Sequence, residues 1–319
     1  MNADHLHSFC IVAREGSVTA AASTLGLSQP AVSRHLRLLE AERGTPLYVR
    51  RGKGVALTPA GRALLPYACS VSQALLRAQE VLAGRVAPDR TRVHIGLSHH
   101  LTTLLTAPLL RATKLYNDDG YLLQLHLREG YTPDLIRGLR EGSLDAAYIL
   151  GTVDRAETNC TAQQVIEEAV VLMVRTDDPL GREESLPTSA LEGETLVVPS
   201  SASSVYKMTM TALQETGTHP GRILEVSGPA AVRSAVHDGL GIGVTIRSFV
   251  DREVRGGALR LVGLDGRGLR APVTKLTRNE RFLLPDQQHA LAYLGTQLGE
   301  EPLASALPSE GLISDADGR

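Results

Sequence analysis

The stretch Ser17–Gly61 decides the fold of the first part of this 319-residue chain: SVTAAASTLGLSQPAVSRHLRLLEAERGTPLYVRRGKGVALTPAG. Ser17 and Ser28 each stand where a serine side chain can cap the helix that follows. Gly26 lies between them, where a glycine can end one helix in a tight turn. The stretch therefore predicts two helices joined by a tight turn, the arrangement of a helix-turn-helix.

The second of these helices has two distinct faces. Val32, Leu36 and Leu39 recur at helical spacing, so they are expected to pack inward. The polar face near the helix N-terminus comprises Gln29, Pro30, Ser33, Arg34 and Arg37. A proline in the first turn costs little, because the N–H it lacks would have no helical partner there. This face is therefore available to touch another molecule.

The segments on either side complete a winged helix-turn-helix. Leu6, Phe9 and Val12 predict an earlier helix that begins after Asp4, a candidate N-cap, and stops near Gly16. Two strand-like runs, 47–50 and 55–58, predict a hairpin. Its cations are Arg50, Arg51 and Lys53. We expect the third helix to enter the major groove of double-stranded DNA while the wing reaches phosphates or the minor groove.

These residues resemble a known family, the LysR-type transcriptional regulators. The resemblance is carried by Ala20-Ala21, Ser28-Gln29-Pro30-Ala31-Val32-Ser33, Arg50-Arg51 and Leu57-Thr58-Pro59-Ala60-Gly61. It implies an operator-binding regulator that forms homodimers or homotetramers. It also implies a small-molecule effector, bound in a periplasmic-binding-protein-like domain of two α/β lobes.

The charge distribution agrees with a nucleic-acid partner. Residues 1–62 hold eight basic and four acidic residues, a net charge of +4, whereas the remainder holds 25 basic and 31 acidic residues, a net charge of −6. A locally basic segment suits an anionic polymer, because contacts to phosphate release condensed counterions. No apolar run is long enough to cross a bilayer, and the N-terminus has no export signal, so a cytoplasmic protein without membrane contact is expected.

The next segment predicts a long helix from Pro59 to about Ala83. An apolar stripe spaced as in a coiled coil runs along it: Leu64, Ala68, Val71, Leu75, Ala78 and Leu82. The stripe packs either on its own domain or, as we favour, against a second chain. Pro66 is expected to bend or loosen the first turns. We divide the chain into a DNA-binding domain (1–62), a linker helix and hinge (63–88), a two-lobed effector domain (89–300) and a flexible tail (301–319).

Strands and helices alternate in the larger part, which predicts a parallel α/β sheet and hence an α/β fold class overall. Ligands of such sheets lie beyond the carboxyl ends of strands, near helix N-termini. Three loops qualify as the effector site, and each residue could also be a mere helix cap. The candidates are Ser98, His99, His100, Gly130, Tyr131, Pro199, Ser200 and Ser201. Hydroxyl groups beside helix N-termini favour a small anion.

Other chemistry finds little support in the sequence. His99 and His100 are adjacent and lack further ligands at metal spacing, so we expect neither a metal site nor a cofactor. Peroxide-sensing relatives use a cysteine pair in the effector domain, whereas Cys160 is alone there. No triad, phosphate loop or paired-carboxylate motif stands out, so an enzyme is not expected. The main alternative is a small-molecule binding or transport protein whose N-terminal bundle is only structural.

Overall fold

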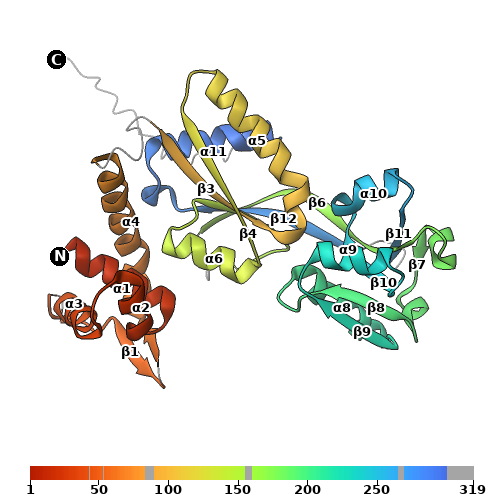
Figure 1. The fold of residues 1–319 in the computed structure, drawn as a ribbon, viewed down its shortest axis with the longest axis horizontal. Helices are drawn as coiled ribbons and strands as arrows, with labels where there is room; N and C mark the ends of the chain where they lie inside the picture. Colours follow the sequence, from red (N-terminus) through yellow and green to blue (C-terminus); the bar gives the residue numbers. More distant parts are fainter. Residues whose placement is uncertain (43, 53, 83–89, 155–159, 265–268, 300–319) are drawn as a thin grey trace, which may run out of the picture.

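The computed structural model describes residues 1–42, 44–52, 54–82, 90–154, 160–264 and 269–299. The N-terminal domain is a winged helix-turn-helix (Figure 1). Its elements are α1 (Ala3–Glu15), α2 (Val18–Leu25), α3 (Gln29–Ala41), β1 (Tyr48–Arg51) and β2 (Gly54–Leu57). Ser17 and Ser28 cap α2 and α3 as predicted, since their Oγ atoms accept from the backbone N–H of Ala20 and Ala31 at 3.4 and 3.3 Å. Gly26 ends α2 with φ +64°, a left-handed conformation that favours glycine.

The core of this domain joins its three helices. Phe9, Ala21 and Leu36 are at most 1% exposed and lie in one apolar cluster with Val32 and Leu39. The expected N-cap of α1 is wrong by two residues: the helix begins at Ala3, and the Asn2 side chain accepts from the N–H of Asp4 at 2.8 Å. An asparagine is as good a cap as an aspartate, so Asn2, two residues earlier, could take the role.

The linker helix α4 spans Pro59–Leu82. It continues through Pro66, so the proline does not end the helix, and the Ser70 hydroxyl donates to the carbonyl oxygen of Pro66 at 2.8 Å. The apolar stripe divides into two halves. Ala68 is buried and Leu64 packs against the core of the N-terminal domain, whereas Val71 is 45% and Leu82 87% exposed. The first half of the stripe thus serves its own domain, and the second half is exposed apart from the half-buried Leu75.

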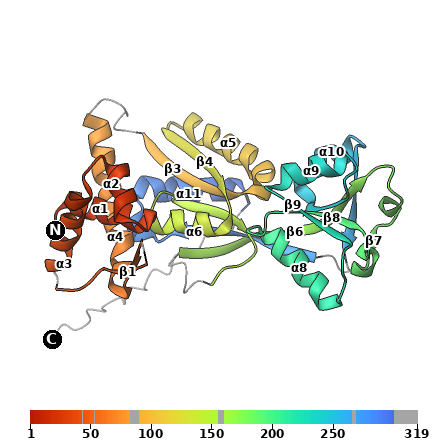
Figure 2. The same cartoon turned by 60° about the horizontal axis from the view of Figure 1, so that its bottom comes forward.

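Two α/β lobes follow, and the chain passes between them on long strands (Figures 1 and 2). Lobe 1 contains β3 (Thr91–Ser98), η1 (His99–Leu101), α5 (Thr102–Asp118), β4 (Leu123–Gly130), α6 (Thr132–Glu141), β5 (Ala146–Leu150), η5 (Glu280–Phe282) and α11 (Pro285–Gln297). Lobe 2 contains η2 (Pro179–Arg182), β7 (Ser185–Leu186), η3 (Thr188–Leu191), β8 (Thr195–Pro199), α8 (Ser204–Thr216), β9 (Arg222–Val226), α9 (Pro229–His237), β10 (Ile242–Ile246), η4 (Arg247–Val250), α10 (Asp251–Arg255) and β11 (Leu259–Leu264). The crossing strands are β6 (Cys160–Arg175) and β12 (Leu269–Arg278).

The sheet is mixed, so the prediction of a parallel sheet holds only within each lobe. The strand order is β4-β3-β5-β12-β6-β10-β8-β9. The outer strands of each lobe pair in parallel, but β12 is antiparallel to β5 and β6, and β6 is antiparallel to β10. This central antiparallel pair makes the crossing between the lobes.

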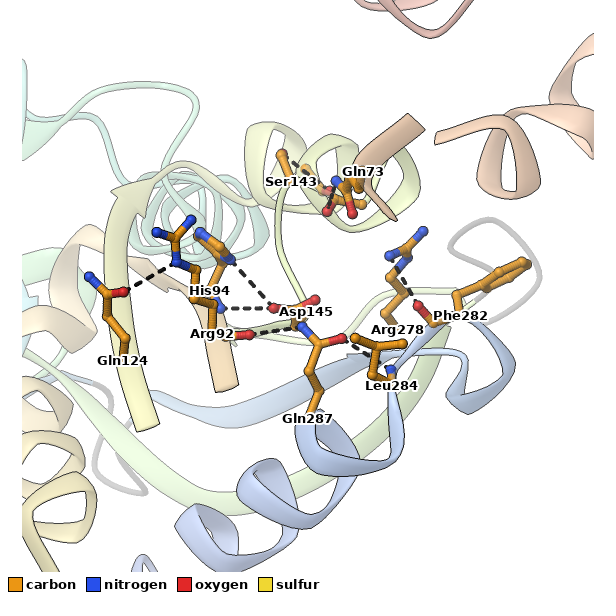
Figure 3. Close-up of polar contacts among 12 residues, drawn as sticks. Gln73, Arg92, His94, Gln124, Ser143, Asp145, Arg278, Phe282, Leu284 and Gln287 are labelled. Carbon is orange, nitrogen blue, oxygen red and sulfur yellow. Dashed lines mark hydrogen bonds and ion pairs between the residues drawn. The ribbon is translucent and has the colours of Figure 1, made fainter. Parts of the chain in front are cut away.

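The C-terminal helix α11 closes lobe 1 by returning to its first strand. The Gln287 side-chain amide donates to the carbonyl oxygen of Arg92 at 2.9 Å (Figure 3). Asp145, 1% exposed, accepts from the N–H of His94 at 2.9 Å and ties the start of β5 to β3. Lobe 1 is therefore built from both ends of the effector region.

Two predicted segments fall outside the described residues: most of the hinge, at 83–89, and the tail, 301–319. Within the described part of the chain, no helix combines the length and the apolar character needed to span a membrane.

Candidate functional site

The polar face of α3 points away from the domain core. Gln29, Pro30, Arg34 and Arg37 are exposed, and Ser33 is half-buried. Gln29 Nε2 donates to Ser33 Oγ at 3.0 Å, and Arg37 Nε donates to the Ser33 carbonyl oxygen at 3.4 Å. The five predicted side chains thus share one surface, which runs from the first residue of α3 past its middle to Arg37. Amide and guanidinium groups in this position are the ones that read adenine and guanine edges in a major groove.

The wing is anchored to the turn after α1. The N–H of Val55 donates to the carbonyl oxygen of Gly16 at 2.8 Å. A Cβ at Gly54 would lie 2.6 Å from that same oxygen, so this approach requires glycine. Arg50 and Arg51 are exposed on β1, and Lys53 lies outside the described residues. The anchored wing therefore holds two guanidinium groups at a fixed place relative to α3.

The cleft between the lobes brings together residues in or next to all three predicted loops. It is lined by Ser98, His99, His100, Tyr131, Thr132, Leu150, Ala202, Ser203 and Ser204. The space between them is small, about 10 Å³. The Tyr131 hydroxyl donates to the carbonyl oxygen of Ser227 at 2.8 Å, a bond from lobe 1 to lobe 2. The ring of Tyr131 also lies 4.4 Å from that of His99.

Three polar atoms on the lobe 1 side of the cleft are buried without a hydrogen-bond partner among the described residues: Ser98 Oγ, His99 Nδ1 and His100 Nε2. Such atoms are costly unless something satisfies them. Burial, with a smaller contribution from His99, lowers the pKa of His100 to about 3. His100 is therefore neutral at pH 7, with one ring nitrogen able to donate and the other able to accept a hydrogen bond.

The structure separates the remaining candidates from this group. Gly130 ends β4 and Pro199 is buried at the end of β8; neither lines the cleft. Ser201 is exposed and its N–H donates to Glu225 Oε1 at 2.8 Å. The Ser200 carbonyl oxygen accepts from the N–H of Ser203 at 2.7 Å, closing a turn.

Thr132 at the start of α6 and Ser203 at the N-terminus of α8, which belong to the predicted loops but not to the candidate residues, reach the cleft. Sequence reasoning missed Ser204 of α8 and Leu150 at the end of β5, which also line it. The available signal was the serine run after β8, which continues to Ser204. Among the described residues, no group of three or more His, Cys, Asp and Glu side chains is arranged to hold a metal ion.

A winged DNA-contacting surface, a linker helix and a two-lobed ligand-binding domain define a one-component regulator. Residues 3–62 match the family described as bacterial regulatory helix-turn-helix protein, lysR family, and residues 87–299 match the LysR substrate binding domain. The chain belongs to the LysR family of transcriptional regulators. The alternative of a transport protein with a merely structural N-terminal bundle is therefore wrong.

Individual relatives agree with this membership. The RuBisCO operon transcriptional regulator of Allochromatium vinosum is 31% identical over 263 residues, which cover 82% of this chain and 84% of that protein. The regulator GltR of Bacillus subtilis is 28% identical, with 82% and 84% covered. Among solved structures, a full-length OxyR variant from Pseudomonas aeruginosa has a TM-score of 0.65 at 21% identity and covers 93% of this chain and 94% of that one. CbnR in complex with its target DNA has a TM-score of 0.53 at 19% identity, with 93% and 100% covered. These likenesses support the same fold.

The low pKa of His100 gives a pH-dependent stability. Below about pH 6.5 the unfolded chain takes up a proton on this histidine, whereas the folded chain does so only near pH 3. Stability is therefore lost as the pH falls through this window.

Between pH 7 and pH 5, wild type should lose about 2 kcal/mol more unfolding free energy than His100→Asn, measured by urea denaturation. His237→Asn, which makes the same substitution at an exposed histidine of α9, is the matched control. Equal pH dependence of wild type and His100→Asn would contradict the prediction.

Proposed function

We propose that this regulator binds a two-fold operator as a homodimer or homotetramer and that a small anionic effector in the cleft controls its action. The observation that carries the proposal is the group of buried, unpartnered atoms Ser98 Oγ, His99 Nδ1 and His100 Nε2. The N-termini of α6 and α8 line the same cleft, one from each lobe. Helix N-termini and polar hydrogens favour negative charge, so a small carboxylate suits the site.

The proposed contacts to DNA are Gln29, Pro30, Ser33, Arg34, Arg37, Arg50, Arg51 and Lys53. The exposure of Gln29, Pro30, Arg34, Arg37, Arg50 and Arg51 supports their assignment, and Ser33 is half-buried between Gln29 and Arg37 on α3. The proposed contacts to the effector are Ser98, His99, His100 and Tyr131 from lobe 1, with Ser203 and Ser204 from lobe 2. Gly130, Pro199, Ser200 and Ser201 shape the loops that carry these residues.

The effector acts by changing the arrangement of the lobes. The hydrogen bond from Tyr131 to Ser227 joins the lobes across the cleft in the arrangement described here. A ligand shifts the balance between this arrangement and another only if it binds the two with different affinities. We further propose that the protein is cytoplasmic and has no catalytic activity. The relatives named above are transcriptional regulators, which supports this role.

A pair of serine variants tests the cleft. Ser98→Phe fills a cleft that has little spare space, whereas Ser201→Phe places the same side chain on an exposed residue outside it. A thermal-shift screen of small carboxylates first identifies a compound that raises Tm and changes operator binding. Ser98→Phe should abolish both effects and retain basal operator binding, and Ser201→Phe should behave as wild type. If the compound shifts Ser98→Phe as it shifts wild type, the cleft is the wrong site.

A further inference from the structure

A second cavity lies where the N-terminal domain meets lobe 1. Its volume is about 610 Å³, within the range that holds drug-sized ligands. One wall comes from α1, β2 and the first turns of α4, and the other from α6, β6, β12 and η5. Figure 2 shows α4 between the winged domain and lobe 1. We call this space the domain-junction cavity.

Hydrogen bonds hold the two walls together beside the cavity. Arg278, 4% exposed, donates through Nη2 to Ser70 Oγ at 2.6 Å and through Nη1 to the carbonyl oxygen of Phe282 at 3.4 Å. Gln73 Nε2 donates to the carbonyl oxygen of Gly142 at the end of α6. Figure 3 shows Gln73 of α4 next to lobe 1 and Arg278 beside Phe282. The cavity is therefore part of a defined contact between α4 and lobe 1.

The charge of the lining is strongly positive. Four arginines line the cavity, Arg62, Arg137, Arg140 and Arg278, against one acidic residue, Glu141. Burial raises the pKa of Glu141, which eases its neutralisation by a proton beside a bound anion. Arg137 pairs with Asp134 on the same helix, and such exposed pairs are weak enough for a ligand to compete. By contrast, neither arginine nor lysine is among the described residues that line the cleft between the lobes.

The rest of the lining is apolar. Ala13, Leu57, Ala63 and Leu65 face the space from the side of the N-terminal domain. Guanidinium groups bind carboxylate and phosphate oxygens through paired hydrogen bonds, and several of them at one site favour several negative charges. We propose that the domain-junction cavity is a second ligand site, which binds a small organic anion carrying two or more negative charges.

A ligand here has a direct path to DNA binding. It would touch α1, the wing and α4 on one side and α6 on the other, so it stabilises this arrangement of the two domains over any other. The site is separate from the cleft, since the two cavities share no lining residue. One ligand would thus act between lobes, and the other between domain and lobe.

Calorimetry on the full-length protein without DNA tests the proposal. The probes are citrate and inorganic pyrophosphate, with acetate as the singly charged comparison. At least one multiply charged probe should bind, and acetate much more weakly. Arg137→Gln/Arg140→Gln removes two exposed cavity arginines and should weaken binding about tenfold or more. Arg111→Gln/Arg252→Gln removes the same charge at exposed positions of α5 and α10, outside the cavity lining, and should bind as wild type.

Two further results decide the location. Ser98→Phe should leave probe binding unchanged. If Ser98→Phe lost probe binding while Arg137→Gln/Arg140→Gln kept it, the anion would lie in the cleft and the proposal would be overturned.

Cys160 also lines the cavity, whereas Cys10 and Cys69 are buried elsewhere. A saturating probe should slow alkylation of Cys160 by iodoacetamide at pH 8.5, followed by mass spectrometry. Binding with an unchanged Cys160 rate, or failure of both citrate and pyrophosphate to bind, would also overturn it.

Discussion

The double variant Gln29→Ala/Arg34→Ala should lose most of its preference for its operator. Each side chain is exposed on the N-terminal half of α3, and each is one of the base contacts proposed above. A good paired contact to a base contributes about 1–3 kcal/mol of discrimination, so two contacts predict a loss of roughly 2–6 kcal/mol in specific binding. Non-specific binding should change less, because only one cation is removed. Titration of fragments of the gene's own upstream DNA, with random DNA as reference, measures both.

A matched variant separates reading of bases from general effects on the domain. Arg14→Ala/Thr24→Ala also removes one cation and one neutral polar side chain, but from exposed positions of α1 and α2. It should keep the wild-type ratio of specific to non-specific affinity. Both variants should unfold as wild type, since the packed face of α3 is untouched. An unchanged operator preference in Gln29→Ala/Arg34→Ala would refute the assignment of this surface.

Leu75→Glu should separate the subunits. Val71, Leu75, Ala78 and Leu82 continue the apolar stripe of α4 beyond the part covered by its own domain. A charge in this seam would be buried without a partner in a paired helix, which is strongly destabilising. We expect wild type to be at least a dimer at micromolar concentration. Leu75→Glu should shift it toward monomer by about a hundredfold or more in Kd, as measured by light scattering over a dilution series.

The neighbouring residue provides the control. Leu76 is 45% exposed and one position further along the helix, so it lies on a different face from Leu75. Leu76→Glu introduces the same charge and should retain the wild-type assembly. A monomeric wild type, or equal dissociation by both variants, would show that the stripe is not the dimer seam.

The N-terminal domain could be predicted because its signals are local. Ser17, Ser28, Gly26 and the spacing of Val32 and Leu36 each act within a few residues, and the structure has the caps and turns where they imply them. The first half of β6 could not be found this way. Its sequence, CTAQQVIEE at 160–168, crosses between the lobes with much of its surface exposed, so it lacks the apolar run of a buried strand.

The cleft was predicted in part. Ser98 ends β3, and His99, His100 and Tyr131 follow strands of the same lobe; all four line the cleft, as the rule that ligands lie beyond strand ends predicts. On the other lobe, the backbone turn from Ser200 to Ser203 directs the later serines inward, and a sequence does not show that geometry. The domain-junction cavity draws on segments from Ala13 to Phe282, so no local pattern could reveal it.

The crossing strands also govern how the chain is made. Strand β5 ends at Leu150, yet its partner β12 begins at Leu269, and α11 ends only at Gln297. Lobe 1 therefore stays open on one side while all of lobe 2 emerges from the ribosome. At about 5–20 residues per second, this interval lasts on the order of ten seconds. During it, the unpaired edge of β5, whose residues are fully buried in the finished protein, is exposed to chaperones and to neighbouring nascent chains.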